Sequence, residues 1–382
     1  PFTVQGGAEA MKHAKCRMNP VAGVLLAVLL LWQAGLSGCD FSAPALYTAT
    51  YMDVFDTVLT LRIASTSRTA ADNAAAAVHA RMLKLHREFD IYHDWAGMNN
   101  LKTVNDHAGD GKPIPVSEDI LNLLELGRVA FDFSDGQVNI CMGSVLSLWH
   151  TARETETLPD AAALERAARH TAPHALLTDT ATGTVCLTDP DARLDVGAIA
   201  KGYAAACAAD ILRGRVESGE LTGVLMELGG QVLALGTRPD GSAWTVGVRD
   251  PRPDDGILRE PPVGASLATC AVKDMSVVTS GTDQRGFFTA DGVRYHHLID
   301  PQTLYPGTRY LSVTVFVPDY AVCRFGSRTV EATAIADALS TALFLLPQEE
   351  GGELLSSVPG AYALWVTADG KIIKSDGWGM PS

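Results

Sequence analysis

The feature that most constrains the fold of this sequence is a series of short strand-like segments that begins after residue 213. Each segment is rich in apolar and β-branched residues, and glycine, proline or aspartate bounds it. Short strands between such turns favour an antiparallel sheet over a doubly wound parallel one. The expected strands are Gly223–Glu227, Val232–Leu235, Trp244–Val248, Ser266–Val272, Val277–Ser280, Val293–Ile299 and Ala361–Val366, the last followed by a hairpin to Ile373.

Helical patterns precede and follow these strands. Apolar residues recur at helical spacing in the first of them, which buries one face. The expected helices are Thr69–Phe89, Glu118–Phe131, Gly143–Trp149, Pro159–His170, a central helix that ends near Arg213, and Glu331–Leu346. We expect a strand or hairpin over Tyr47–Ile63, a loop over Gly97–Gly111, and a hairpin over Val185–Leu194 with Asp189-Pro190-Asp191 as its turn. The sequence therefore predicts one large α+β domain with two lobes, over residues 47–382.

The N-terminal region has the pattern of a targeting segment. Three basic residues, Lys12, Lys15 and Arg17, precede an apolar run, Val21–Trp32, which is short for a membrane span. Leu36-Ser37-Gly38-Cys39 then matches the lipoprotein signal box, in which the cysteine is lipidated after cleavage. An uncleaved anchor helix is the alternative.

These signals predict the organisation of the N-terminus. Residues 1–38 comprise upstream residues, with Met11 as the expected start, and a lipoprotein signal peptide. Cys39 carries the lipid, and residues 39–46 form a tether to the membrane. Asp40 favours retention at the outer face of the cytoplasmic (inner) membrane, which is the periplasmic side in a Gram-negative cell.

Charge and cysteine content narrow the class of partner. The formal net charge of −14 argues against nucleic acid, because phosphate backbones are held mainly by surplus lysine and arginine. The cysteines after Cys39 show no C-x-x-C spacing and are odd in number, so they indicate neither a zinc site nor a complete disulfide framework. One disulfide is compatible with the sequence. These cysteines are Cys141, Cys186, Cys207, Cys270 and Cys323.

The stretch Leu194–Ala205 resembles a ligand-facing loop that leads into a helix. Gly197 and Gly202 permit a close backbone approach, and a helix start offers free N–H groups to phosphate oxygens. Lys201 adds a full positive charge. A small-residue helix that is buried for packing, with Asp195 as its N-cap, would explain the same residues.

The last predicted helix carries a second polar pair. Asp337 and Thr341 are four residues apart, so one helical turn places both oxygens on one face. A carboxylate with a hydroxyl suits a hard cation such as Mg²⁺. The alternative is that both side chains are simply solvated, although an unpaired aspartate among alanine, isoleucine and leucine would be costly.

Other polar turns lie near the predicted strands. His297, in Tyr295-His296-His297-Leu298-Ile299-Asp300-Pro301, could act as a general base, and a purely structural role for either histidine is the alternative. Adjacent histidines on a strand face opposite sides, so they would not chelate one metal. Thr279-Ser280-Gly281 is a hydroxyl-rich turn, and Gly229-Gly230 lacks the third glycine of a dinucleotide-binding fingerprint.

Taken in order, these motifs resemble the ApbE family, the FAD:protein FMN transferases, over about residues 50–370. The resemblance rests on Asp195–Tyr203, Gly229-Gly230, Thr279–Gly281, His297–Pro301 and Ala336–Thr341. It implies an α+β fold related to the T-fold. It also implies Mg²⁺-dependent transfer of FMN from FAD to a threonine of a target protein, with release of AMP.

The resemblance also implies roles for individual residues. Those expected to contact FAD are Phe55, Tyr92, Gln137, Val138, Asn139, Asp195, Lys201 and Ile299. Those expected around the metal are Asp337, Ser340, Thr341 and the backbone carbonyl of Ala198, and His297 stands at the position of the family's candidate base. The expected partner is a flavin-accepting protein such as a redox-pump subunit.

The sequence departs from the family pattern at three places. Phe55-Asp56-Thr57 stands where Met-Gly-Thr is common, Asn139 replaces an acidic residue, and Leu304-Tyr305-Pro306 stands where Thr-Gly is common. None of these changes removes the expected metal ligands. Two other functions stay open at this point: an FAD pyrophosphatase that gives FMN and AMP, and a non-catalytic FAD-binding lipoprotein.

Overall fold

The computed structural model describes residues 43–252, 266–283, 286–289, 293–325 and 328–378. Residues 44–382 form one compact unit. The predicted signal peptide, Cys39 and residues 39–42 of the tether lie outside the described residues. No helix among the described residues is long and apolar enough to cross a membrane.

The centre of the fold is an eight-stranded sheet in which each neighbouring pair of strands is antiparallel. The strand order is β1-β2-β6-β7-β10-β13-β16-β17. The bounds are β1 Ala45–Val54, β2 Thr57–Ser65, β6 Gly223–Leu228, β7 Gln231–Gly236, β10 Met275–Gly281, β13 Tyr310–Pro318, β16 Tyr362–Thr367 and β17 Ile372–Lys374.

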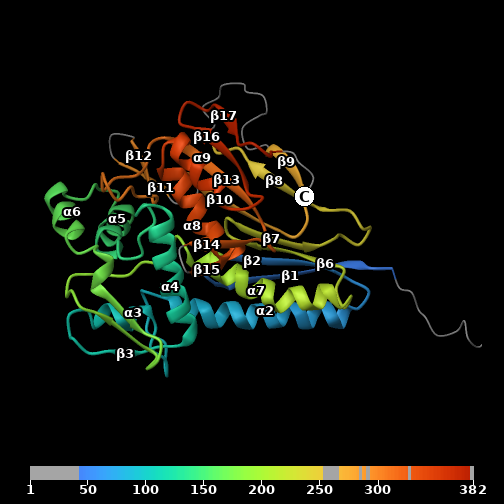
Figure 1. Cartoon of the computed structure of the whole chain (residues 1–382), viewed down its shortest axis with the longest axis horizontal. Coiled ribbons are helices and arrows are strands. Elements are labelled where there is room, and N and C mark those ends of the chain that lie inside the picture. The colour runs from blue at the N-terminus through green and yellow to red at the C-terminus, as the bar shows by residue number, and fades with distance from the viewer. Residues whose placement is uncertain (1–42, 253–265, 284–285, 290–292, 326–327, 379–382) are drawn as a thin grey trace, which may run out of the picture. The chain divides into compact units, whose positions relative to one another are not determined.

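Helices cover one face of this sheet, and Figure 1 shows α2 and α7 side by side along it. The alternation of side chains along each strand explains why both faces are apolar. Leu59, Leu61 and Val313 face the helices, whereas Leu225 and Phe316 face the β8–β9 hairpin on the other side. The helices are α2 Arg68–Phe89, α3 Leu101–Asp106, α4 Glu118–Phe133, α5 Gly143–Thr155, α6 Ala161–Ala168, α7 Ala200–Glu217, α8 Ala332–Leu345 and α9 Gln348–Ser356.

Within the described ranges, four small sheets accompany the large one. In Figure 1, β11 and β12 lie near α5 and α6, at one side of the large sheet. The strands are β3 Ile114–Pro115, β4 Leu176–Asp179 and β5 Thr184–Leu187; β8 Trp244–Arg249 and β9 Ser266–Val272; β11 Gly286–Phe288 and β12 Arg294–His296; β14 Val322–Phe325 and β15 Arg328–Glu331.

The predicted α+β class with antiparallel sheets is confirmed, and three local expectations are wrong. The expected loop Gly97–Gly111 contains α3, which Asn100 caps through a reciprocal pair of hydrogen bonds with Thr103. The hairpin expected at Val185–Leu194 lies earlier, because the Asp179 carboxylate accepts from Ala181 N and Thr182 N and so forms the turn between β4 and β5. The helix expected to end at Trp149 continues to Thr155. The strand β13 and the helix α9 were not expected.

Candidate functional site

The loop before α7 presents its polar groups without a side-chain cap. The N-cap of α7 is Ile199, which makes no side-chain hydrogen bond, so Asp195 is not the N-cap. Asp195 Oδ1 instead accepts from Gly197 N at 2.9 Å, and Asp195 N donates to Ile140 O. Within the first turn of α7, Ala200 N donates to Val196 O at 2.9 Å and Gly202 N donates to Asp337 Oδ2, so these amides already have partners, and the phosphate site stays a prediction.

The helix α8 carries Asp337 inside the core. Every residue of α8 is buried, and Asp337 itself is 4% exposed. Lys201 Nζ lies 3.3 Å from Asp337 Oδ2, and Gly202 N lies 3.3 Å from the same oxygen. The structure thus brings together two segments that are 136 residues apart, and the α7 lysine balances the buried carboxylate.

Gly202 makes this approach of the two helices possible. A Cβ atom at Gly202 would lie 2.5 Å from Ala334 O and 2.9 Å from Asp337 Cβ. These distances are well below van der Waals contact, so a larger residue would force α7 away from α8. The glycine therefore sets the distance between Lys201 and Asp337.

Three hydroxyl groups gather beside the next turn of α8. Ser280 Oγ, at the end of β10, lies 2.7 Å from Ser340 Oγ and 3.3 Å from Thr341 Oγ1. Ser340 Oγ also donates to Asp337 O. These residues are buried, so the hydroxyls and the Asp337 carboxylate form a set of hard oxygen donors inside the fold.

A second polar chain reaches the loop before α7 from α5. Tyr92 OH lies 2.8 Å from His150 Nδ1, and His150 Nε2 lies 3.7 Å from Asp195 Oδ2. The Asp195 side chain is 12% exposed, whereas Tyr92 is 54% exposed. The structure therefore connects two of the predicted FAD contacts, Tyr92 and Asp195, through a histidine that the sequence did not single out.

The two adjacent histidines have different surroundings. His296 Nε2 donates to Gly307 O and its Nδ1 accepts from Leu298 N, which fixes a neutral tautomer. Burial lowers the pKa of His296 to about 4, and the nearby charge of Arg294 also lowers it. His297 is partly exposed. His296 is therefore structural, and the role of His297 as a base stays a prediction.

The comparisons with known proteins agree with this architecture. A model of the ApbE family matches residues 55–365. The chain belongs to the ApbE family. A protein of Treponema pallidum (strain Nichols), named FAD:protein FMN transferase, is 34% identical over 291 residues, which cover 72% of this chain and 73% of that protein. A protein of Klebsiella pneumoniae (strain 342) with the same name is 32% identical over 270 residues, covering 70% of this chain and 75% of that protein.

Solved structures of ApbE proteins have the same fold. The crystal structure of the Thermotoga maritima ApbE protein has a TM-score of 0.70 and 28% sequence identity, with 87% of this chain and 97% of that chain covered. The flavin transferase ApbE from Vibrio cholerae has a TM-score of 0.69 at 20% identity, with 88% and 98% covered. The family membership predicted from the ordered motifs is confirmed.

The remaining expected FAD contacts of this ApbE chain lie in turns and in the core. Val138 is buried, and Asn139 accepts from Cys141 N and donates to Thr171 O, which holds the turn before α5. Gln137 Oε1 is buried and has no hydrogen-bond partner among the described residues. Ile299 packs with Trp149 in a separate apolar cluster. These residues stay predictions as FAD contacts.

Phe55 lies in the tight turn between β1 and β2. Phe55 and Asp56 both have positive φ values, 51° and 49°, as the two central residues of a type I′ turn require. Phe55 N donates to His86 Nδ1. His86 also meets the Trp95 ring, and Trp95 Nε1 donates to Asp90, which binds Tyr92 N. A line of contacts thus connects Phe55 with Tyr92.

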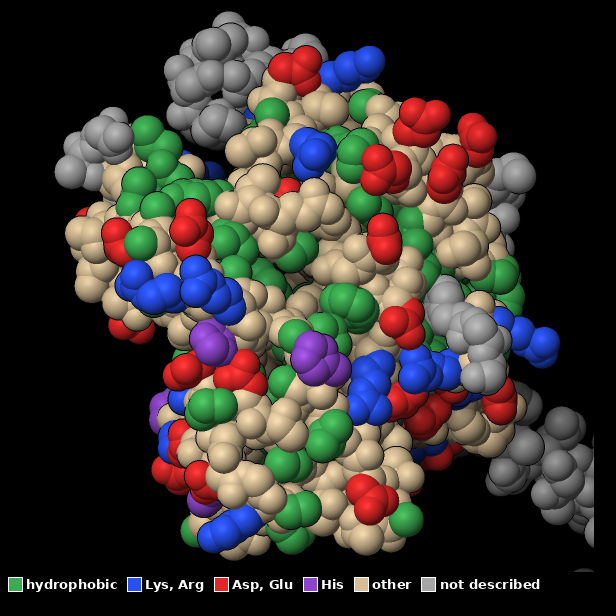
Figure 2. All heavy atoms as spheres, turned by 60° about the vertical axis from the view of Figure 1, so that its left-hand side comes forward, with side chains coloured by type: hydrophobic (Ala, Val, Ile, Leu, Met, Phe, Trp, Pro, Cys, Tyr) green, Lys and Arg blue, Asp and Glu red, His purple; other side chains and the backbone are tan. Residues whose placement is uncertain are grey.

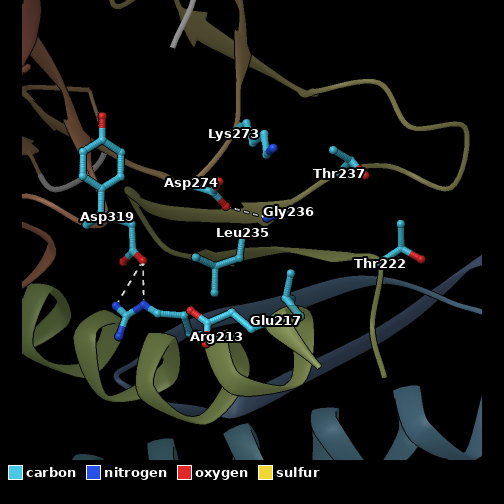
Figure 3. A pocket seen from close by; sticks show the side chains of 11 residues that line it. Arg213, Glu217, Thr222, Leu235, Gly236, Thr237, Lys273, Asp274 and Asp319 are labelled. Atoms are coloured by element: carbon cyan, nitrogen blue, oxygen red, sulfur yellow. Dashed lines mark hydrogen bonds and ion pairs between the residues drawn. The ribbon is translucent and has the colours of Figure 1, made fainter. Parts of the chain in front are cut away.

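A cavity of about 410 Å³ lies apart from these residues (Figure 3). In it, Arg213 binds Asp319, and Asp274 accepts from Gly236 N. None of the predicted site residues lines this cavity. Its lining comprises Arg213, Val216, Glu217, Thr222, Leu235, Gly236, Thr237, Lys273, Asp274, Asp319 and Tyr320.

The surface on the side of α5 and α6 is chemically mixed. Figure 2 brings this side forward and shows histidine and hydrophobic side chains next to one another near the middle of the face. Acidic and basic side chains surround them.

Proposed function

We propose that this chain transfers FMN from FAD to a protein acceptor. The observation that carries the proposal is the contact between α7 and α8, where Lys201 and Gly202 hold the buried Asp337 beside three hydroxyls. Relatives that share most of the chain are named FAD:protein FMN transferase. We further propose that the acceptor group is a threonine hydroxyl and that AMP is the product released.

The donor set at this contact suits Mg²⁺. Asp337, Ser340, Thr341 and the carbonyl of Ala198 would hold the ion, and they offer the hard oxygen ligands that it prefers. When bound, the ion neutralises negative charge on the pyrophosphate of FAD. Lys201 Nζ lies 3.3 Å from Asp337 Oδ2 and balances this buried carboxylate, so a bound ion would share the carboxylate with the ammonium.

The protein's own groups account for the remaining requirements of the reaction. The Lys201 ammonium and the positive N-terminal end of the α7 dipole attract phosphate oxygens and stabilise the charge that develops on them. An imidazole nitrogen of His297 takes the proton from the threonine hydroxyl. The threonine oxygen then bonds to the phosphorus on the FMN side, and the bond from that phosphorus to the bridging oxygen breaks, which releases AMP.

The test is an AMP-release assay with a protein acceptor. The chain from residue 40 onward is mixed with FAD, Mg²⁺ and a flavin-accepting protein domain, and the acceptor is weighed by mass spectrometry. Acceptor-dependent AMP with an added FMN mass supports the transferase. AMP and free FMN without labelling would indicate the pyrophosphatase, and bound FAD without products would indicate the non-catalytic carrier.

Asp337 is the residue that this test should address first. We expect Asp337→Asn to lower the rate of FMN transfer by about a hundredfold or more, since it removes the charge of the central ligand. A thermal unfolding curve checks that the variant folds. A folded Asp337→Asn variant with unchanged turnover would contradict the assignment.

We also propose that Cys39 carries a lipid anchor, which would place the enzyme at the outer face of the cytoplasmic membrane. The support is the order of basic residues, apolar run and Leu36–Cys39 box in the sequence. The acceptor would then be a protein exposed on the same side, such as a redox-pump subunit. Cys39→Ser should move the protein from the membrane fraction to the soluble fraction.

A further inference from the structure

We propose that His150 is a positioning residue that joins the Tyr92 ring to the Asp195 carboxylate, so that a planar ring of FAD meets a fixed aromatic surface. The inference rests on the proposed function, because it takes FAD as the ligand. It adds a residue that neither the motif series nor the comparisons assign. Its basis is the contact of one imidazole with two predicted FAD contacts.

Asp90 holds the backbone of Tyr92 in place. Asp90 Oδ1 accepts from Tyr92 N at 2.7 Å, and Asp90 also binds His93 N and Trp95 Nε1. Burial raises the pKa of Asp90, but these N–H donors outweigh burial and the net shift is downward. Asp90 is therefore an ionised anchor, and it holds the chain at Tyr92 in one turn.

The hydroxyl end of the Tyr92 ring is held by His150. Its oxygen is 2.8 Å from His150 Nδ1, and the two rings are tilted by 49° with centroids 5.9 Å apart. With its backbone and its hydroxyl both held, an exposed ring cannot swing freely about its side-chain torsions. An exposed ring held in this way is a preorganised stacking surface, which lowers the entropy cost of binding a planar ligand.

The other imidazole nitrogen faces the loop before α7. A neutral His150 with its proton on Nε2 satisfies both contacts, since Tyr92 OH then donates to Nδ1 and Nε2–H faces Asp195 Oδ2. Asp195 Oδ1 is occupied by Gly197 N, so His150 constrains the other oxygen. The imidazole thus couples the stacking surface to the carboxylate.

His150 itself stands on a well-fixed helix. The preceding residue, Trp149, is buried and donates from Nε1 to Leu304 O. The His150 side chain is 28% exposed, so its replacement does not open a core cavity. Variants at this position should therefore fold.

The experiment measures FAD affinity by flavin fluorescence and steady-state KM and kcat for AMP release, in the full chain. His150→Ala and Tyr92→Phe should each raise the FAD dissociation constant and KM about fivefold while kcat stays within about twofold, as expected for one lost hydrogen bond. The double variant should be no weaker than the worse single variant, because both changes break the same link. His174→Ala, an exposed histidine elsewhere, should leave all values unchanged.

Two shape-matched variants separate the two contacts. His150→Asn places a polar group near the position of Nδ1 and should restore most of the Tyr92 contact. His150→Gln reaches toward the position of Nε2 and should restore only the Asp195 contact. His150→Ala should also weaken the binding of only one of the two fragments FMN and ADP, which carry the two different rings of FAD. Equal losses with both would contradict a stacking contact.

The outcomes distinguish this inference from the proposed function. If the wild-type protein neither binds FAD nor releases AMP, both the proposed function and the role of His150 are refuted. If it does so and His150→Ala has unchanged KM, or loses kcat alone, only the role of His150 is refuted. A fivefold loss of affinity that His150→Asn reverses supports the role.

Discussion

The close contact between α7 and α8 predicts that Gly202→Ala will destabilise the protein and impair its activity. The added Cβ would lie 2.5 Å from Ala334 O and 2.9 Å from Asp337 Cβ. Relief requires the helices to separate by about 1 Å, because carbon atoms prefer about 3.5–4.0 Å. The first obstacle is a backbone carbonyl in a fully buried helix, which has no rotamer to change.

The expected cost follows from two opposing effects. Overpacking of this kind costs about 1–3 kcal/mol, and an immovable carbonyl favours the upper end. Replacing glycine by alanine inside a helix gains about 1 kcal/mol. We therefore expect Gly202→Ala to lower the free energy of unfolding by about 2 kcal/mol. It should also lower FMN transfer at least about tenfold, since it displaces Lys201 from Asp337.

The same helix offers a matched control. Gly214 also lies in α7, but a Cβ atom there would have nothing within 4 Å. Gly214→Ala should therefore stabilise by up to about 1 kcal/mol, and the difference between the variants, about 3 kcal/mol, isolates the steric effect. Urea unfolding of both variants measures it. Equal unfolding midpoints would refute the argument that Gly202 sets the distance between the helices.

Two further predictions concern buried charge. Arg213→Met should lower the free energy of unfolding, measured in urea, by about 3 kcal/mol, because the Asp319 side chain is 3% exposed and would lose its cation. As the control, Arg215→Met removes an exposed pair with Glu220 and should cost under about 1 kcal/mol. Equal costs for the two variants would contradict this prediction. The pKa of His296 is about 4 in the fold and about 6.5 unfolded, so the unfolded chain takes up the proton first as pH falls. The free energy of unfolding should then decrease by up to about 3 kcal/mol from pH 6.5 to 4. Unfolding curves should show that His296→Gln lacks this part of the decrease. The same pH dependence in the variant and the wild type would contradict the prediction.

The large sheet was only partly predictable from the sequence. Most of its strands follow from their apolar segments and turn residues, yet β13 was missed although Tyr310–Pro318 is rich in β-branched residues. Its residues are buried on both faces, so the run lacks the polar alternation that marks a half-exposed strand. The prediction of a hairpin at Val185–Leu194 was wrong for a different reason. Asp189-Pro190-Asp191 has the composition of a turn, but Asp179 and Gly183 (φ +68°) form the actual one.

In the candidate site, too, features set by local sequence patterns were predictable, and contacts between distant segments were not. The shared face of Asp337 and Thr341 follows from helical spacing, and the ordered motifs identify the family. The pairing of Lys201 with Asp337 is a contact between segments 136 residues apart, which no local pattern specifies. His150 had no signal of its own, because a histidine that follows a buried tryptophan in a helix is compatible with a solvated surface.

The complete burial of α8 has a consequence for how this protein moves. Amide hydrogens in this helix should be among the slowest to exchange with deuterium, since they open only when the main core opens. The carboxylate that the reaction needs therefore cannot be repositioned by a local fluctuation. Motions that admit or release a ligand must therefore come from segments outside α8, while the reactive centre stays as rigid as the core.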